Sequence, residues 1–406
     1  MSLLSVEDAL ARLIGGAVKA SRTEAIDLFD ADGRVLAEAV SAGLTQPPFD
    51  NSAMDGYALR SEDATALGTR LTVIGESAAG RRFTGTVGKG QAVRIFTGAP
   101  MPEGADAVLL QEDATRLDGN IIETNFVVAE GRHVRPRGQD FLEGEVVLNP
   151  GEILDAGRLT VAAAMNRPQI TVYRKPLVAV IATGDELVPA GTTPGPDQIV
   201  ASSIYGVAAL AKAAGAEVLY LGIVSDDKSQ IERAVAKAQE ARADIIVTLG
   251  GASVGDHDLV QPVLKSIGME LDFWKIAMRP GKPLMVGSLG SARVLGLPGN
   301  PVSSMVCALL FLEPLIAHMA NLPPPERRAT ATTAIALAGN DHRQDYVRAK
   351  LTRRPDGVLE AHSFGKQDSS QMKIFARADC LIVRRPNAAA VPAGAECDIL
   401  TLRQPI

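Results

Sequence analysis

The sequence is poor in the residues that build disulfide frameworks or zinc sites. Its 406 residues include three cysteines, Cys307, Cys380 and Cys397, and no two of them form a Cys-x-x-Cys pair. An odd number of thiols without such spacing predicts a reducing compartment in which the cysteines serve packing. A Walker lysine loop and a His-Glu-x-x-His motif are also missing, which excludes the P-loop and zincin classes.

Charge and hydropathy exclude two further classes of partner. The net charge of −6 argues against general binding to nucleic acid, which requires a basic face. The first twenty residues contain Glu7, Asp8 and Arg12 and lack the apolar core of a signal peptide. Residues 302–320 approach the length of a membrane span, but Glu313-Pro314 interrupts them. We therefore expect a cytoplasmic protein, with a buried helix at this position and no contact with a membrane.

The length of the chain and the pattern of its apolar and turn residues predict several domains. A chain of 406 residues is too long to fold around a single hydrophobic core, which implies two to four domains. Ser5 can cap an amphipathic helix that begins at Val6. From Leu44 to about Leu142, short apolar runs alternate with Gly and Pro turns, which indicates a mostly β region. A helix over 158–165 and a strand over 169–172 then lead into a predicted linker at 174–176.

After Pro176 the pattern alternates between strands and helices. Continuous apolar strands at 177–182, 217–223 and 244–249 are separated by helical segments near 203–214 and 231–238. Such alternation predicts a mostly parallel sheet with helices on both faces. A further strand over 294–297 precedes a long helix, with Asn300 as its cap and Pro301 in its first turn. Strand-like segments near 345–352 and 380–384 predict a small C-terminal β domain.

Acidic and glycine-rich loops follow three of the predicted parallel strands. They are 183–186 (Thr-Gly-Asp-Glu), 225–227 (Ser-Asp-Asp) and 250–258 (Gly-Gly-Ala-Ser-Val-Gly-Asp-His-Asp). Ligands of open α/β sheets bind at the carboxyl ends of the strands, and glycines there allow close approach to the backbone. Converging carboxylates favour a hard cation such as Mg²⁺. The alternatives are helix capping for one of the pair Asp226 and Asp227 and for Asp258, and a solvated loop carboxylate for Glu186.

Positive charge is presented opposite these acids. The segment from Lys275 to Pro283 carries Arg279 and Lys282 among prolines and a glycine. The helix start at 300–304 adds free N–H groups and two hydroxyls, a second receptor for an anion. Acids for a metal beside cations for an oxyanion are typical of phosphoryl chemistry. A solvated basic loop is the alternative for Lys282. The turn-rich segments 47–57 and 97–102 read as ordered loops, the first too polar to be a strand.

Seven motifs occur in one order along the chain: FDNSAMDGYA from Phe49, FTGAPMPEGADAV from Phe96, RPRGQD from Arg135, TGDEL from Thr183, GGASVGDHD from Gly250, RPGKP from Arg279 and LPGNPVS from Leu297. Together they closely resemble the molybdopterin molybdenumtransferase (molybdenum insertase) family, which is related to the gephyrin E domain. The resemblance covers nearly the whole chain.

The resemblance implies a homodimer of four-domain subunits. The first domain is then discontinuous, residues 1–43 and 143–174, with residues 44–142 inserted as a mainly β domain. Residues 175–325 form the molybdopterin-binding α/β domain and residues 326–406 a C-terminal β-barrel.

The implied reaction uses adenylylated molybdopterin and molybdate as substrates. Members of the family cleave the phosphoanhydride with Mg²⁺, release AMP and leave molybdenum on the dithiolene sulfurs. The implied partners are an adenylyltransferase that supplies the substrate and enzymes that accept the cofactor. Two alternatives remain: a molybdopterin adenylyltransferase, which shares the molybdopterin-binding fold, and a gephyrin-like scaffold without enzyme activity.

The resemblance also assigns roles to residues. The implied catalytic residues are Asp55, Thr97, Glu186, Asp226, Asp258 and Lys275, of which Glu186, Asp226 and Asp258 serve the metal. The implied pterin and AMP site contains Gly251, Ser253, Asp256, Pro298 and Asn300. The implied molybdate site contains Arg279, Lys282, Ser303, Arg348 and Ser369. Asp55 and Thr97 resemble positions that reach the partner subunit's cleft. Many relatives carry lysine at position 279, where this chain has arginine, whose planar fork bonds differently from an ammonium.

Overall fold

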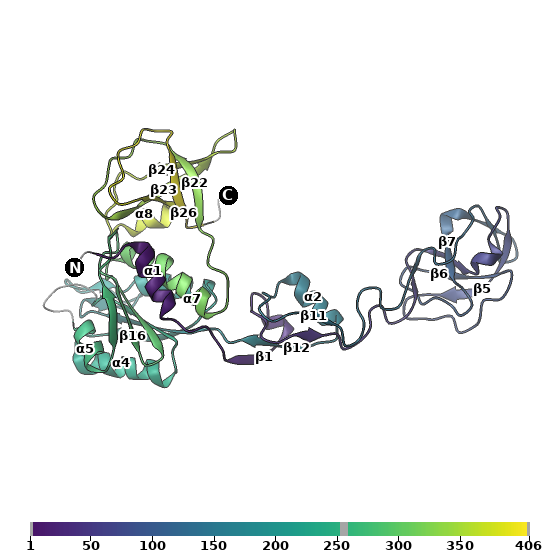
Figure 1. The fold of residues 1–406 in the computed structure, drawn as a ribbon, viewed down its shortest axis with the longest axis horizontal. Helices are drawn as coiled ribbons and strands as arrows, with labels where there is room; N and C mark the ends of the chain where they lie inside the picture. Colours follow the sequence, from purple (N-terminus) through teal and green to yellow (C-terminus); the bar gives the residue numbers. More distant parts are fainter. Residues whose placement is uncertain (1–2, 252–258, 404–406) are drawn as a thin grey trace. The chain divides into compact units, whose positions relative to one another are not determined.

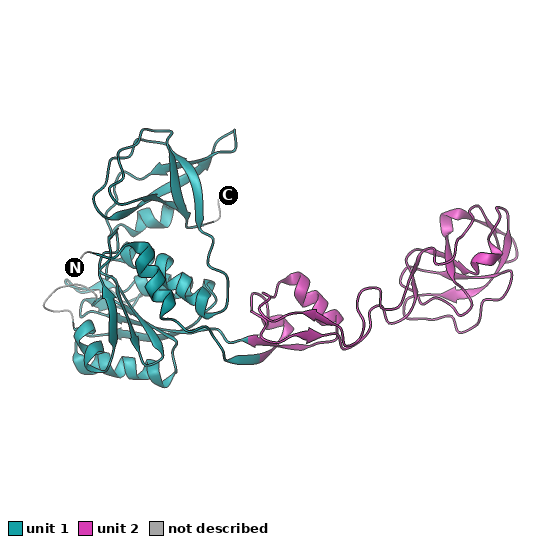
Figure 2. Cartoon of the chain, in the orientation of Figure 1, with its two compact units in different colours: residues 1–24, 173–406 teal, residues 25–172 magenta. Residues whose placement is uncertain are grey.

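The computed structural model describes residues 3–251 and 259–403. The chain forms two compact units, one of residues 1–24 with 173–406 and one of residues 25–172 (Figure 2). The first unit contains the α/β region and the C-terminal strands, and the second contains the N-terminal β-rich region (Figure 1).

A six-stranded sheet organises the first unit, in the order β16-β13-β17-β21-β20-β18. The strands are β13 (Leu177–Thr183), β16 (Glu217–Val224), β17 (Ile245–Leu249), β18 (Glu270–Trp274), β20 (Met285–Leu289) and β21 (Ala292–Leu297). β16, β13, β17 and β21 run parallel, and β20 is antiparallel to both of its neighbours. The strands β16 and β17 flank β13 on opposite sides, so the chain reverses its direction of winding there. Such a switch point opens a crevice at the carboxyl ends of the strands.

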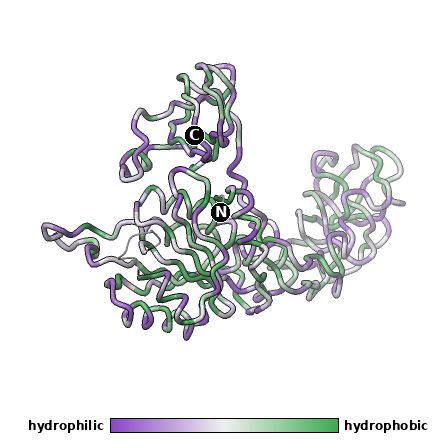
Figure 3. The backbone as a smooth tube through the Cα atoms, turned by 60° about the vertical axis from the view of Figure 1, so that its left-hand side comes forward, coloured by the Kyte–Doolittle hydropathy of each residue, from purple (hydrophilic) through white to green (hydrophobic). Residues whose placement is uncertain are grey.

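Helices cover both faces of this sheet. They are α1 (Val6–Gly15), α3 (Ser203–Ala213), α4 (Lys228–Glu240), α5 (Val260–Ser266), α6 (Pro301–Cys307), the π-helical turn η4 (Ala308–Leu312) and α7 (Glu313–Met319). Alternate residues of β13 enter the two cores: Val178 and Val180 pack with α1, α3, α6 and α7, whereas Ala179 and Ile181 pack with α4 and α5. Figure 3 colours the backbone by the hydropathy of each residue, with hydrophobic residues in green. Burial on both faces explains the continuous apolar runs.

The continuous helix Pro301–Met319 is the core helix that the sequence predicts. Within the described chain it alone is long and apolar enough to cross a membrane, judged by length and composition, and 78% of its most apolar window is buried inside the protein. It begins at Pro301 with Asn300 in the N-cap position, as predicted, although the Asn300 side chain makes no capping bond.

The C-terminal strands close into a five-stranded barrel. They are β22 (Arg328–Thr333), β23 (Gln344–Arg353), β24 (Leu359–Ser363), β25 (Cys380–Arg384) and β26 (Glu396–Thr401), with α8 (Met372–Arg377) before β25. The order β23-β24-β22-β26-β25 is closed by pairing between β23 and β25. The two-residue strand β19 (Met278–Arg279) joins β23 from outside. The sheet, the barrel and the several domains confirm the predicted fold class.

The second unit contains a second six-stranded sheet, ordered β7-β4-β6-β5-β9-β8. Its strands are β4 (Gly56–Leu59), β5 (Arg70–Ser77), β6 (Gln91–Ile95), β7 (Ala107–Leu110), β8 (Ala114–Leu117) and β9 (Ile121–Thr124). A separate hydrophobic core contains residues that precede this sheet in the sequence and residues that follow it, including Leu36, Leu154 and Val172. Around that core lie β1 (Thr23–Asp27), β2 (Val40–Ser41), β11 (Val146–Leu148), α2 (Ala156–Ala164) and β12 (Gln169–Tyr173). The four predicted domain boundaries stay a prediction.

One local prediction was wrong, and two strands were missed. The segment 47–57 is not wholly loop, because β3 (Asn51–Ser52) pairs with β10 (Val134–Arg135) and β4 begins at Gly56. Here tertiary pairing overrides polar composition. The antiparallel strands β18 and β20 were not predicted, since their short runs lack an intervening helix.

Replacement of Ile316 by alanine tests the packing of the core helix. Ile316 is fully buried, and Ile335 in the same unit is 50% exposed. Truncation of a buried isoleucine removes apolar contact and leaves a cavity, so we expect Ile316→Ala to destabilise the first unit by about 2–5 kcal/mol. Ile335→Ala is the matched control, with an expected cost below about 1 kcal/mol. Urea unfolding measures both; equal losses would contradict the described packing.

Candidate functional site

The loops at the carboxyl edge of the central sheet lie side by side. The Gly184 N–H donates to the Val224 carbonyl (3.1 Å), which joins the β13 loop to the end of β16. The Gly250 N–H donates to the Leu297 carbonyl (3.2 Å), which joins the β17 loop to the end of β21. The loops after these four strands therefore form one continuous edge.

Glycines make this close approach possible. A Cβ on Gly250 would lie 2.6 Å from the Thr183 carbonyl oxygen, and one on Gly251 would lie 2.1 Å from Val260 Cγ2. Both residues have positive φ, 93° and 63°, which side chains other than glycine rarely adopt. A Cβ on Gly299, in the loop after β21, would be 3.7 Å from Gly250 Cα. These close contacts make glycine the required residue at positions 250 and 251.

The acids of these loops have different surroundings. The Glu186 carboxylate lies over Gly184, where a Cβ would be 2.4 Å from Oε2. The Asp226 N–H donates to Asp185 Oδ1 at 3.0 Å, so Asp185 ties the β13 loop to the β16 loop. Asp185 was not among the predicted site residues, and only its place in the loop signalled it. Asp227 caps α4 by accepting from the Gln230 N–H at 3.0 Å, which confirms the capping alternative for one of the two neighbouring acids.

Three hydroxyl oxygens at the same edge lack a partner in the described structure. They belong to Thr183 at the end of β13, Ser225 after β16 and Thr248 in β17, and all three are buried. A buried polar atom without a hydrogen bond is costly, so such a group points to a missing ligand or solvent. Thr183 and Ser225 adjoin the loops that carry Glu186 and Asp226.

No group of three or more His, Cys, Asp or Glu side chains in the described part of the chain is placed to hold a metal ion. Of the predicted metal set, Glu186 and Asp226 lie on the joined β13 and β16 loops, and Asp258 lies outside the described residues. The predicted residues Ser253 and Asp256 also lie outside them. Pro298 and Asn300 lie in the loop between β21 and α6.

A buried arginine lies on the barrel strand β23. Arg348 is 1% exposed, and its Nη1 donates to the Asp368 carbonyl (2.9 Å) and its Nε to Gln367 Oε1 (3.1 Å). Burial lowers the pKa of Arg348. No ion pair between Arg348 and a carboxylate occurs among the described residues. A buried cation held by neutral oxygens is prepared to receive an anion.

The segment that holds Arg348 also contacts the start of α6. The Val302 N–H donates to the Ser369 carbonyl at 3.2 Å. Ser303, the next residue on α6, is 5% exposed. The segment 368–369 therefore contacts both Arg348 and the start of α6, and the assignment of Ser303, Arg348 and Ser369 to an oxyanion site stays a prediction.

The cationic segment 275–283 packs against the same helix. Cys307 Sγ lies 3.6 Å from the Gly281 carbonyl, which places the Lys282 loop beside α6. The Lys275 ammonium lies 4.2 Å from the centre of the Trp274 ring, a cation–π contact. The Arg279 guanidinium bonds to Asp345 and lies 3.9 Å from Asp341, so carboxylates of the barrel already hold this predicted molybdate ligand.

In the second unit, Asp55 and Thr97 bond to each other. Asp55 Oδ1 accepts from the Thr97 N–H and Oγ1, both at 2.8 Å. The bond from the Thr97 backbone, followed by the bond from its hydroxyl, lowers the pKa of Asp55. Nearby loop residues, among them Phe49, Asn51 and Gly98, line a hollow of about 610 Å³. The pair is an ordered, ionised carboxylate presented by two loops.

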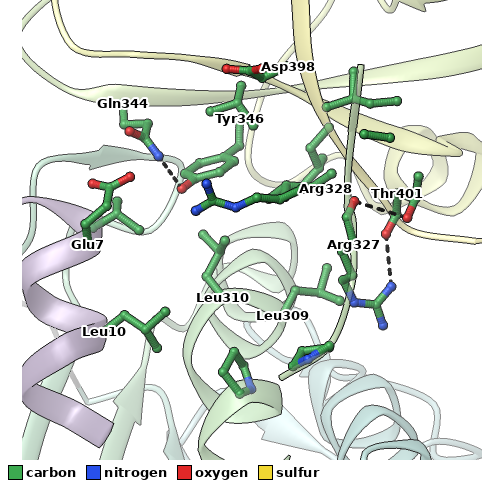
Figure 4. Close-up of a pocket in the computed structure, with 18 of the residues that line it drawn as sticks. Glu7, Leu10, Leu309, Leu310, Arg327, Arg328, Gln344, Tyr346, Asp398 and Thr401 are labelled. Atoms are coloured by element: carbon green, nitrogen blue, oxygen red, sulfur yellow. Dashed lines mark hydrogen bonds between the residues drawn. The ribbon is translucent and has the colours of Figure 1, made fainter. Parts of the chain in front are cut away.

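A cavity of about 670 Å³ lies elsewhere in the first unit (Figure 4). Glu7 and Leu10 of α1, Leu309 and Leu310 of η4 and Tyr346 of β23 line it. Its described lining includes none of the predicted site residues. We therefore locate the candidate site by its glycines, acids and buried cation and not by cavity size.

Replacement of Asp227 tests whether this residue, and not the neighbouring Asp226, caps α4. Bonds from Ser229 and from the Gln230 N–H hold the pKa of Asp227 below its usual 3.8. Its carboxylate therefore stabilises the folded state at neutral pH, and this stabilisation is lost as the pH falls through the folded pKa. We expect Asp227→Ala to lower the melting temperature at pH 7, and the difference from wild type to shrink near pH 3. A difference of equal size at both pH values would contradict capping by the ionised form.

Three family models match successive stretches of the chain. Residues 4–166 match the MoeA N-terminal region (domain I and II), residues 179–318 a probable molybdopterin binding domain, and residues 330–402 the MoeA C-terminal region (domain IV).

Full-length relatives agree. The molybdopterin molybdenumtransferase of Haemophilus influenzae is 36% identical over 97% of both chains, and that of Nostoc sp. is 37% identical over 95% of this chain and 89% of its own. Two structures of molybdopterin biosynthesis MoeA proteins from Pyrococcus horikoshii superpose with TM-scores of 0.83 and 0.80, at 28% and 27% identity, covering 99% and 98% of this chain and 100% of theirs. The chain belongs to the molybdopterin molybdenumtransferase family.

Proposed function

We propose that this protein takes adenylylated molybdopterin and molybdate as substrates, releases AMP and leaves molybdenum on the dithiolene. Family membership already assigns the chain to molybdenum cofactor biosynthesis as a molybdenum transferase. One observation supports the finer proposal. The loop after β21 connects the carboxyl edge of the central sheet, which suits a nucleotide, to the surroundings of Arg348, which suit an oxyanion. Gly299 lies against Gly250 at that edge, and three residues later Val302 bonds to the segment that holds Arg348.

The carboxyl edge of the sheet suits the pterin and its phosphates. Gly250 and Gly251 leave the backbone accessible, and Pro298 and Asn300 border the same edge. A planar pterin and a pyrophosphate need close backbone approach of this kind. We assign Gly251, Pro298 and Asn300 to this half of the site, together with Ser253 and Asp256, which lie outside the described residues.

The donor set at this edge fits Mg²⁺. Glu186 and Asp226 supply carboxylate oxygens, and the unpartnered hydroxyls of Thr183 and Ser225 lie on the same loops. Magnesium prefers oxygen ligands and is usually held by one or two carboxylates and substrate phosphates. Bound there, Mg²⁺ would neutralise charge on the phosphoanhydride. We assign Glu186, Asp226 and Asp258 to this role, while Asp185 keeps the β13 and β16 loops together.

The oxyanion half of the site suits molybdate. Arg348, Ser303 and Ser369 belong to segments joined at the start of α6, where the positive end of the helix dipole also favours an anion. Lys282 adds a positive charge from the adjoining loop, and Lys275 lies in the same segment. These groups would hold the molybdate dianion in place while water or a molybdate oxygen attacks the phosphoanhydride of the adenylylated pterin, so that a new P–O bond forms as the bond between the two phosphates breaks and AMP leaves. Catalysis of this kind consists of positioning and charge stabilisation.

The ordered Asp55–Thr97 pair belongs to the second unit. As part of the proposal, the protein acts as a cytoplasmic homodimer in which this pair completes the partner subunit's cleft. An adenylyltransferase would supply the substrate and apo-enzymes would accept the product. The alternative of an adenylyltransferase is disfavoured, because the family matches extend on both sides of the molybdopterin-binding region.

Release of AMP tests the proposal. The purified protein with Mg²⁺ is expected to release AMP from adenylylated molybdopterin faster when molybdate is present. Asp226→Asn is expected to lower the rate at least about 100-fold, because it removes a charge from the metal and phosphate site. The measurement is the rate of AMP formation at saturating substrate.

Asp227→Asn is the matched control, since it changes the adjacent carboxylate in the same way and an asparagine still caps α4. We expect it to retain activity within about twofold. Equal losses in the two variants would contradict the assignment of Asp226. Binding of the pterin without any AMP release would favour the gephyrin-like scaffold.

A further inference from the structure

Asp345 is a buried carboxylate with only one of its oxygens satisfied. It is 6% exposed, its Oδ2 accepts from Arg279 Nη2, and its Oδ1 lacks a partner in the described structure. Burial of a charge is costly unless it is paired. The ion pair with Arg279 therefore offsets the cost of burying the Asp345 carboxylate. Arg279 thus has a structural role in addition to any contact with substrate.

Backbone pairing reinforces this ion pair. Arg279 and Asp345 are register partners where β19 runs parallel to β23, and the Gln344 N–H donates to the Ala277 carbonyl at 2.8 Å. Lys282 lies three residues after Arg279, and Arg348 lies three residues after Asp345 on β23. The pair thus fastens the Lys282 segment to the strand that carries Arg348.

The Arg279 guanidinium and the buried Arg348 lie on different faces of β23. Side chains alternate along a strand. Val347 and Ala349, which share the face of Asp345, pack into the barrel core, whereas Tyr346, which shares the face of Arg348, packs into the core of the α/β region. Arg279 also approaches Asp341 (3.9 Å), whose pKa Arg343 holds well below its usual value. Two carboxylates on the barrel side therefore engage Arg279.

We infer that Arg279 and Asp345 act as a positioning pair that holds Lys282 and Arg348 in register for the oxyanion, and that Arg279 is not itself an oxyanion ligand. This role rests on the proposed function. An arginine suits it, because a planar guanidinium can face two carboxylates at once and an ammonium cannot do so with the same geometry.

Neutralisation of Asp345 gives opposite results for the two roles of Arg279. If the pair positions the site, Asp345→Asn loosens the junction and weakens molybdate binding. If Arg279 binds molybdate directly, the same change frees its guanidinium from a competing carboxylate, so binding stays the same or becomes tighter. The sign of the change decides between them.

Calorimetric titration with molybdate alone measures this sign in the full-length protein. We expect Asp345→Asn to weaken binding roughly tenfold, a usual size for coupling within one network. The KM for molybdate should rise equally, while kcat at saturating molybdate and the KM for adenylylated molybdopterin should change little. Asp356→Asn, which alters an exposed barrel carboxylate paired with Arg354 at 2.9 Å, is the matched control and should bind as wild type.

A second variant keeps the test decisive if Asp345→Asn folds poorly. In Arg279→Met/Asp345→Leu, apolar contact of similar volume replaces the ion pair. A positioning pair predicts molybdate affinity within about threefold of wild type, whereas a direct ligand predicts a large loss. Unchanged or tighter binding by Asp345→Asn, or loss in the double variant, overturns the inference. Failure of the wild-type protein to bind molybdate would instead overturn the proposed function.

Discussion

The arrangement of strands around β13 is the constraint on which the site depends. Because β16 and β17 flank β13 on opposite sides, the chain changes its direction of winding there, and such a switch point opens a crevice at the carboxyl ends of the strands. A ligand can reach the strand ends only if the backbones of neighbouring loops pack closely together. Gly250 meets this need, since a side chain there would collide with the Thr183 carbonyl. Neighbouring loops can then present carboxylates and hydroxyls along one edge.

The second half of the site depends on charges that the fold buries at a cost. Arg348 is almost fully buried with carbonyl and amide oxygens for partners, and Asp345 is buried with one partner. Neither arrangement is what stability alone would favour, because apolar residues would pack there at lower cost. Buried, preorganised charge is what recognition of an oxyanion requires. Both residues belong to β23, so one barrel strand organises this half of the site.

Patterns that are local in sequence predicted much of this structure. Apolar periodicity gave the parallel strands and their helices, and the Pro-Gly-Asn-Pro motif gave the start of α6. The acidic loops after β13, β16 and β17 were predicted to converge, and the described β13 and β16 loops do so. Family resemblance, and not periodicity, led to the barrel residues Arg348 and Ser369.

Other features depend on contacts between residues distant in sequence, which no local pattern reports. The antiparallel strand β20 and the short strand β3 form because a neighbouring strand accepts them. The capture of Arg279 by Asp345 joins residues 66 positions apart. The role of Asp185 as a tie between two loops follows from a single backbone bond to Asp226. Such pairings became visible only in the folded chain.

Reconstitution of a molybdenum-free oxidoreductase is the most direct test of the central claim that this protein transfers molybdenum to the pterin. Purified protein would be incubated with adenylylated molybdopterin, Mg²⁺ and molybdate, and the product added to the apo-enzyme. The account predicts oxidoreductase activity that depends on both this protein and molybdate. AMP release without any active cofactor, at every molybdate concentration, would contradict it.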